Sequence, residues 1–392
     1  MVFCYVEYIG CNQASALGVL SNKKLRKIKM KRALVSCMLS TAGFMSFSTL
    51  ADSVTHTNLL MPEYAATSIK QQIKQLPEAA TSYEKWVSTP ALEALTLEPM
   101  HFPHVSYERK DLKVRVDGIY ALTLKWNLST EDSERRKYFE KASELIVSIA
   151  KHISPGTHTP NESILHSVYE AYSLLRPEMA LKDTEIVDRW LRRQGEYFKN
   201  YQLTGTLLKN NWENVRISIL FNIALTLGDE ELYGYSVGAL KRFVKVNIEP
   251  DGKTNDFINR DALTYHAYNQ QYYGRILKAV KIYKGEQEAQ RLFTYKEKGH
   301  GSIKDAYDFW KPYFTEPEKN VHIEFVNTGW KPDLKRGDAN KPYNPTGTVY
   351  AMAHMIPVDK YAFTMIQKVM PGSEPYTLRL STWLNNALHA KK

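Results

Sequence analysis

The chain has 392 residues, of which 43% are hydrophobic and 24% are charged, and its formal net charge is +10. That length is sufficient for one large domain or two small ones with a sizeable core. All three cysteines, Cys4, Cys11 and Cys37, precede residue 52. The rest of the chain therefore excludes a disulfide framework, a zinc-cysteine site and a thiol nucleophile.

The first 51 residues are typical of an export signal that follows an unrelated extension. From Met30 the sequence reads MKRALVSCMLSTAGFMSFSTLADSV, with a charged start, a short Ser-rich apolar run and a small residue before Asp52. We predict that translation begins at Met30, so that residues 1–29 are an extension from a start codon assigned too early. We further predict a signal peptide at 30–51 and a single mature domain at 52–392. The alternatives are a membrane anchor for the apolar run and a basic nucleic-acid-binding arm for 1–29.

Removal of the signal leaves a mildly basic protein. Seven Lys and Arg residues and one acidic residue lie before Asp52, so the remainder carries a net charge of about +4. That charge fits an anionic polymer as partner. We expect no nucleic-acid partner and no stable membrane insertion after signal removal, a periplasmic or secreted location, and a monomer.

Helical periodicity dominates the sequence after residue 52. Apolar residues at three-to-four spacing predict helices at 133–153, 161–175, 184–201, 212–227, 230–246, 259–283, 286–293, 302–313, 359–369 and 377–390. The segment 212–227 is apolar nearly all round, which predicts an inner, buried helix. Segments 82–117 and 325–347 are interpreted as long loops, and the best strand signal is the short VHIEFVN stretch at 321–327.

About ten helices joined mostly by short loops favour antiparallel neighbours. No fixed-period repeat is evident, which argues against a solenoid. The predicted fold class is therefore all-α, a toroid or incomplete (α/α) barrel of antiparallel helical hairpins.

A first polar cluster, KNNWENVR at 209–216, stands at the start of the most apolar predicted helix. Asn210 at that position is as readily a helix cap as a ligand. Amide and guanidinium groups of Asn211 and Arg216 facing a cavity would bind a sugar carboxylate. Trp212 would stack on a sugar ring or pack in the interior.

A second cluster, DGKTNDFINRDALTYHAY at 251–268, feeds a turn and a polar loop into a helix. Helical spacing puts positions 261, 265, 268 and 272 on one face, so Tyr265 and Tyr268 form a stripe with His266 a quarter-turn away. An aromatic stripe in the core is the alternative, but the adjacent Arg260 and the acidic residues favour a polar cleft.

Two further sites are weaker. Asn161 lies in a polar helix entry, and His322 shares a face with Glu324 if the segment is extended. A histidine and one carboxylate make a weak metal site, and a structural hydrogen bond is the favoured interpretation. Phosphate-binding, nucleophile-elbow and zinc-protease motifs do not occur in the sequence, and we expect neither a metal nor a cofactor.

At these residues the chain resembles the alginate lyase family, the helical-toroid polysaccharide lyases that act on uronic-acid polymers. The similarity covers roughly 110–370 and consists of NESILHSVYEAYSLL, KNNWENVRISIL, DGKTNDFINRDALTYHAYNQ, HIEFVNTGWKPDLKR and YNPTGTVYAM in the family's order. The resemblance implies an enzyme that cleaves its polymer by β-elimination.

The resemblance also implies residue roles. Asn211 and Arg260 would neutralise the substrate carboxylate, Tyr268 would be the main catalytic tyrosine, and Tyr265 and His266 would line the same site. The further candidates for substrate binding are Asn210, Trp212, Arg216, Asn161 and His322. Two departures mark a divergent member: Trp212 stands where characterised members have His, and Arg260 is one residue further from Tyr268.

The residue types suit this chemistry. Donors stabilise the charge that builds up on the carboxylate when the C5 proton leaves, and one tyrosine serves as base and then acid if a cation lowers its pKa. The alternatives are a non-catalytic periplasmic polysaccharide-binding protein and a toroid glycoside hydrolase that uses two of Asp251, Asp256 and Asp261.

Overall fold

The structure is a computed structural model that describes residues 58–101, 109–129, 131–156 and 162–390. The described residues all lie in the second of the two units into which the chain divides, Ser53–Lys392. The predicted extension and signal peptide lie outside the described residues, as does Asn161. No helix within the described ranges is long and apolar enough to cross a membrane.

The second unit is built from helices, which confirms the predicted all-α class. In the described part of the chain no strand forms, and the only β pairing is two isolated bridges, Ile248 with Thr254 and Ile323 with Pro342. The first half contains α1 (Glu63–Gln75), α2 (Pro77–Tyr83), α3 (Thr89–Ala94), α4 (Arg109–Leu128), α5 (Asp132–His152), α6 (His166–Leu175), α7 (Leu181–Asn200), α8 (Asn211–Leu227) and α9 (Glu230–Asn247). The second half contains α10 (Asn255–Arg260), α11 (Leu263–Lys284), α12 (Glu286–Phe293), α13 (Ile303–Trp310), α14 (Pro312–Thr315), α15 (Val349–Met355), α16 (Ala362–Val369), α17 (Pro375–Leu378) and α18 (Leu380–Ala387).

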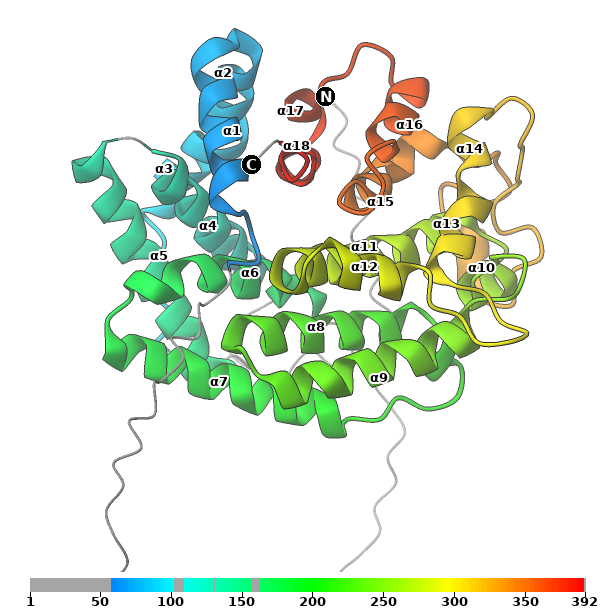
Figure 1. Cartoon of the computed structure of the whole chain (residues 1–392), viewed down its shortest axis with the longest axis horizontal. Helices are drawn as coiled ribbons and strands as arrows, with labels where there is room; N and C mark the ends of the chain where they lie inside the picture. The colour runs from blue at the N-terminus through cyan, green and yellow to red at the C-terminus, as the bar shows by residue number, and fades with distance from the viewer. Residues whose placement is uncertain (1–57, 102–108, 130, 157–161, 391–392) are drawn as a thin grey trace, which may run out of the picture. The chain divides into compact units, whose positions relative to one another are not determined.

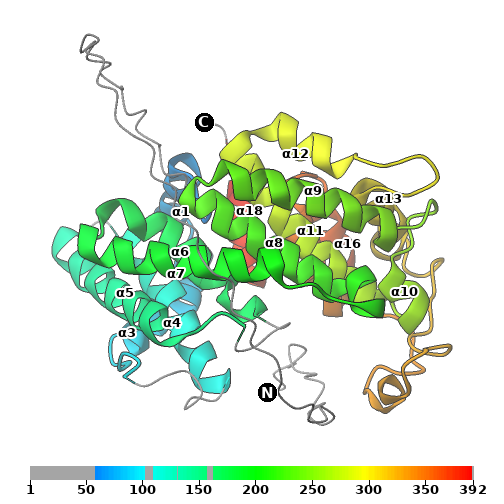
Figure 2. The ribbon, with the colours of Figure 1, turned by 90° about the horizontal axis from the view of Figure 1, so that it is seen from below.

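The helices form an inner and an outer layer (Figures 1 and 2). Each inner helix contacts the next in the order α4, α6, α8, α11, α15 and α18. Helix α1 contacts both α18 and α4. The outer helices α5, α7 and α9 each pack against an inner neighbour, as antiparallel hairpins joined by short loops require. This unit is an (α/α) toroid, as predicted.

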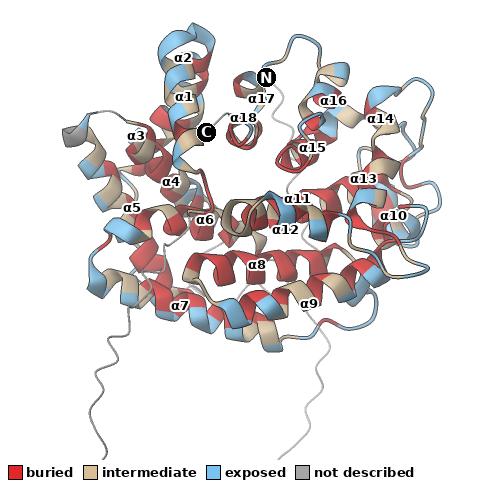
Figure 3. Ribbon diagram, viewed as in Figure 1, coloured by how far each residue is buried: buried red, intermediate tan, exposed pale blue. Residues whose placement is uncertain are grey.

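Helix α8 is the most buried element (Figure 3). It lies between α7 and α9 on one side and α6 and α11 on the other, so every face meets protein. Its composition explains this position, because a helix that is apolar all round has no face suited to water. The helix ends at Gly228, whose φ of 69° is a left-handed conformation that glycine adopts without steric cost.

The helix predicted at 259–283 is confirmed from Leu263 onwards, but its predicted beginning is wrong. Helix α10 ends at Arg260, Asp261 takes a left-handed φ of 49°, and α11 begins at Leu263. The loop 321–327 holds this break: the carbonyl of Asp261 accepts from the backbone N–H of Phe325 at 2.7 Å, and its carboxylate accepts from that of Asn327 at 2.7 Å. Asp261 therefore does not share a helical face with the tyrosines.

The predicted loop at 82–117 is also wrong in part. A π-helical turn at Glu84–Ser88, α3 and the start of α4 occupy much of it. Gly118 permits this packing, since a Cβ at that position would lie 2.6 Å from the Leu97 side chain. The second predicted loop, 325–347, is confirmed apart from short 3₁₀ turns at Lys331–Lys335 and Pro345–Thr348.

Candidate functional site

The carboxylate of Asp256 connects three helices, α8, α10 and α11. Asp256 lies in the first turn of α10 and is 2% exposed. It accepts from the side chain of Asn269 on α11 at 2.5 Å and from the backbone N–H of Asn211 on α8. Asn211 and the residue that follows Tyr268 therefore share one buried carboxylate. Asn211 and Asn269, which are 58 positions apart in the sequence, are thus held together.

The two adjacent amides at the start of α8 have different environments. Asn210 is the N-cap, and its side-chain oxygen accepts from the backbone N–H of Trp212 at 3.0 Å. Asn211 is 8% exposed, and none of the described residues hydrogen-bonds its side-chain amide. Asn210 is accounted for as a cap, whereas Asn211 retains donors for a ligand. Trp212 is partly buried beside them.

Arg260 is held by an acidic partner from the distant loop. Its guanidinium makes a bidentate ion pair with Asp333 and donates from Nη2 to the hydroxyl of Tyr265 at 2.8 Å. The same guanidinium lies 4.0 Å from the centre of the Tyr265 ring. Burial raises the pKa of Tyr265, and the positive charge of Arg260 opposes that rise. Arg260 therefore contacts the phenol of Tyr265 directly. The predicted role, in which this cation lowers the pKa of Tyr268, required the same contact with Tyr268.

Tyr268 lies one turn further along α11 and is partly buried. Its hydroxyl is 3.1 Å from that of Tyr272, and the two rings meet edge to face with centroids 5.1 Å apart. Residues 265, 268 and 272 share a face of α11 by their spacing. The predicted tyrosine stripe is therefore present within the helix, without Asp261.

Glu324 caps the beginning of the helix that carries these tyrosines. Its side chain is 1% exposed and accepts from the backbone N–H groups of Leu263 at 2.8 Å and Thr264 at 3.2 Å. A carboxylate here satisfies two otherwise unpaired donors and opposes the positive end of the helix dipole. The segment that carries Glu324 and Asp333 thus fixes two features. Glu324 fixes the start of α11, and Asp333 fixes the position of Arg260.

Glu324→Ala is expected to lower the free energy of unfolding by about 2 kcal/mol, because two buried N–H groups lose a charged acceptor. The midpoint of thermal unfolding should fall by a few degrees. Glu324→Gln retains a side-chain acceptor and serves as the control, with a smaller loss. Equal unfolding midpoints for wild type and the Ala variant would show that the cap does not stabilise α11.

His266 does not reach the same surface as the tyrosines. Its ring is 0% exposed, Nδ1 lies 3.1 Å from the hydroxyl of Thr254, and Nε2 lies 2.9 Å from the carbonyl of Ala306. Burial lowers the pKa of His266 to about 4, so the ring is neutral at neutral pH. Because His266 lies a quarter-turn from the tyrosines, its side chain points into the core. There its contact with Ala306 links α11 to α13.

Two more of the predicted binding residues have structural partners. Arg216 is buried, with a bidentate ion pair to Glu213 at 2.8 and 2.6 Å and a bond to the carbonyl of Phe198 at 2.5 Å. It therefore does not face the tyrosines as an available cation. His322 is partly buried, with Nε2 3.0 Å from the carbonyl of Asp261 and 4.0 Å from Glu324.

The His322 contact agrees with the structural role favoured from sequence, although its hydrogen-bond partner is the Asp261 carbonyl. Among the described residues, no group of three or more His, Cys, Asp or Glu side chains is arranged to hold a metal ion.

Sequence reasoning did not identify Asp333 and Arg336 as parts of this site. Asp333 is 3% exposed and holds Arg260, while the Arg336 guanidinium lies 5.6 Å from the Tyr265 ring centre. Helical spacing does not reveal a partner 73 residues away, and the available signal was that both residues lie in the segment HIEFVNTGWKPDLKR.

The ionisation of Asp256 makes stability depend on pH. Burial raises the pKa of Asp256 from 3.8 to about 6, so between those values the folded protein binds more protons than the unfolded chain. The free energy of unfolding must then fall as the pH rises through this window, by roughly 3 kcal/mol from this group alone.

Asp256→Asn does not ionise, so its stability should decrease less than that of wild type between pH 4 and pH 6. Urea unfolding at several pH values measures the difference. Parallel stability curves for the two proteins would contradict a raised pKa at this position.

Comparison with known proteins gives the class. The family model described as alginate lyase matches residues 108–320. A search of curated proteins finds no match. Among solved structures, alginate lyase A1-III from Sphingomonas species A1 aligns with 16% identity and a TM-score of 0.53 over 85% of this chain and 97% of that chain.

Two variants of alginate lyase A1-III, each complexed with tetrasaccharide, also align. The tyrosine-to-phenylalanine variant has 15% identity and a TM-score of 0.57 over 85% of this chain and 97% of that chain. The histidine-to-alanine variant has 17% identity and a TM-score of 0.53 over 87% and 98%. At these identities the likeness establishes the helical-toroid fold. Fold and family together define a polysaccharide lyase. The chain belongs to the alginate lyase family.

Proposed function

We propose that this lyase cleaves a uronic-acid polymer, such as alginate, polymannuronate or glucuronan, by β-elimination. The family match supports the substrate class, since alginate is itself a uronic-acid polymer. The observation that carries the residue assignment is the shared carboxylate of Asp256, which ties the start of α8 to α11 beside Tyr268.

In the proposed reaction, the unpartnered amide of Asn211 donates to the sugar carboxylate as negative charge accumulates on it. Tyr265 adds a second donor. Because its hydroxyl oxygen already accepts from Arg260, its own O–H remains free to donate to the substrate. Fixed donors of this kind stabilise the charged intermediate without reorganisation during the reaction.

Tyr268 is assigned the proton transfers. As phenolate it takes the C5 proton, the electrons of that bond form the C4–C5 double bond, and the bond from C4 to the glycosidic oxygen breaks. The phenol then returns the proton to the leaving oxygen. A tyrosine is the remaining candidate among the predicted proton carriers, because His266 is fully buried with both ring nitrogens engaged.

The test is a screen of purified protein against polymannuronate, polyguluronate and glucuronan. Elimination produces a double bond conjugated to the carboxylate, so products absorb in the near ultraviolet. New reducing ends without this absorbance would indicate hydrolysis instead.

The hydrolase alternative is disfavoured by the surroundings of its carboxylates. Asp256 is buried, Asp251 forms an exposed ion pair with Lys253, and Asp261 binds the backbone of the 321–327 loop.

A non-catalytic polysaccharide-binding protein is the second candidate, and Trp212 in place of histidine favours it. Polymer binding without ultraviolet-absorbing product on every uronate tested would support that function.

We also propose that the protein is exported by a signal peptide at 30–51 and acts as a monomer in the periplasm or outside the cell. The apolar run after Lys31 and Arg32 supports this location. Amino-terminal sequencing of the exported protein would test the cleavage site before Asp52.

A further inference from the structure

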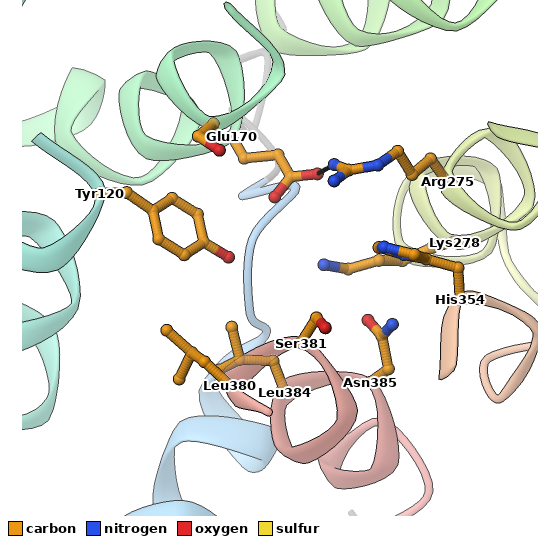
Figure 4. A pocket seen from close by; sticks show the side chains of 10 residues that line it. Tyr120, Glu170, Arg275, Lys278, His354, Leu380, Ser381, Leu384 and Asn385 are labelled. Atoms are coloured by element: carbon orange, nitrogen blue, oxygen red, sulfur yellow. Dashed lines mark hydrogen bonds and ion pairs between the residues drawn. The ribbon is translucent and has the colours of Figure 1, made fainter. Parts of the chain in front are cut away.

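A separate cavity of about 130 Å³ lies among the inner helices α4, α6, α11, α15 and α18 (Figure 4). Its polar lining includes Tyr120, Glu170, Arg275, Lys278, His354 and Asn385. None of the residues assigned to proton transfer or charge neutralisation lines it. We call it the lumen cavity.

Lys278 is the most unusual group in the lumen cavity. The residue is only 5% exposed, and its ammonium forms no hydrogen bond or ion pair with another described residue. Figure 4 shows the amine pointing into the open space. Burying an ammonium without a partner is costly, and burial lowers the pKa of Lys278 accordingly.

The charges around the cavity do not balance. Arg275 pairs with Glu170 at 3.4 Å, and Glu170 is the one acidic side chain among the described residues that line the cavity. One carboxylate therefore faces two cations, Arg275 and Lys278. His354 adds no third positive charge, since burial lowers its pKa well below the usual range and keeps the ring neutral.

Neutral hydrogen-bonding groups complete the lining. The hydroxyls of Tyr120 and Ser381 point toward the same space as the Lys278 amine (Figure 4). Asn385 is fixed there by donating to the carbonyl of Ala353 at 2.9 Å. A cation surrounded by hydroxyl donors is the arrangement that binds an oxyanion through charge-assisted hydrogen bonds.

The size of the cavity limits the ligand. A volume of about 130 Å³ has room for several waters or for a small polar ligand. This accommodates a carboxylate with the atoms attached to it. We propose that the lumen cavity binds the carboxylate of a sugar acid, with Lys278 as the cationic anchor.

Two sources would supply this carboxylate. One is a free sugar acid, such as a released product. The other is the terminal uronate of a bound polymer, because Arg275 follows Tyr268 by seven residues on the same face of α11, about 10 Å along the helix. The second source rests on the proposed function, whereas the first does not.

Calorimetric titration with free glucuronate, and with glucose as the neutral control, tests the site. Wild type should bind glucuronate and not glucose, and Lys278→Met should weaken glucuronate binding about tenfold or more. Lys284→Met is the matched control on the same helix, since Lys284 pairs with Glu230 outside the cavity, and it should bind as wild type does.

Two opposite effects separate a ligand site from a merely structural lysine. Glu170→Gln removes the competing carboxylate and should tighten glucuronate binding several-fold. Lys278→Met should also raise the unfolding midpoint of the ligand-free protein, because it removes an unpaired buried charge. Absence of glucuronate binding to wild type, or undiminished binding to Lys278→Met, would overturn the proposal.

Titration of Tyr268→Phe with a short oligouronate distinguishes the sources. The double variant with Tyr268→Phe and Lys278→Met is compared with Tyr268→Phe alone. Weaker oligouronate binding by the double variant shows that the cavity binds the terminal residue of the polymer. Unchanged binding shows that it binds the free acid. If no polymer yields an unsaturated product, the proposed cleavage fails, while the glucuronate titration still decides the lumen cavity.

Discussion

Tyr268→Phe is expected to lower kcat/KM on the cleaved polymer by about 10²- to 10⁴-fold, because the variant has no group to carry the C5 proton. The ring still packs against Tyr272, so the helical circular dichroism and the unfolding midpoint should remain close to wild type. The rate of ultraviolet-absorbing product formation is the measurement.

Tyr265→Phe is the matched comparison on the same helix face. It removes a hydrogen-bond donor that Arg260 positions and is expected to lower kcat/KM by about tenfold. If the order is reversed, with Tyr265→Phe inactive and Tyr268→Phe active, then the proton carrier is the tyrosine that touches the guanidinium.

Asn211→Ala is expected to lower kcat by about 10²- to 10³-fold, the usual effect of removing one donor to a developing oxyanion. Its side chain makes no hydrogen bond to the described residues, so the free energy of unfolding should change little. Initial rates at saturating polymer, together with urea unfolding, measure the two quantities.

The neighbouring Asn210→Ala provides the control with the opposite profile. It removes the cap on the Trp212 N–H, so it should cost about 1 kcal/mol of stability while kcat stays near wild type. Two adjacent asparagines would then separate binding of the substrate from capping of the helix. A kcat for Asn211→Ala equal to that of wild type would remove this amide from the mechanism.

The resemblance places Trp212 where characterised members of the family have histidine, which gives these variants their importance. The only histidine near the tyrosines in sequence, His266, is fully buried with both ring nitrogens engaged. The proposed mechanism therefore assigns its roles to phenols, amides and the Arg260 cation. The loop that supplies Asp333 and Glu324 becomes part of the site through the groups that it holds.

The sequence by itself determined the helical class and its most buried element. The continuous apolar character of 212–227 predicted an inner helix, and α8 has this burial because a helix without a polar face must be covered on all sides. The capping role considered for Asn210 was also readable, since capping depends on residues within one turn.

Tertiary structure decided where polar groups face. Periodicity ran through Asp261, yet contacts from the loop 321–327 break the helix there. The same local pattern could not tell that His266 is buried while Tyr268 is only partly so, or that Asp333 would hold Arg260. The lumen cavity depends on five helices at once. Helical spacing is a property of neighbours in the chain, whereas these partners are fixed only when distant helices pack together.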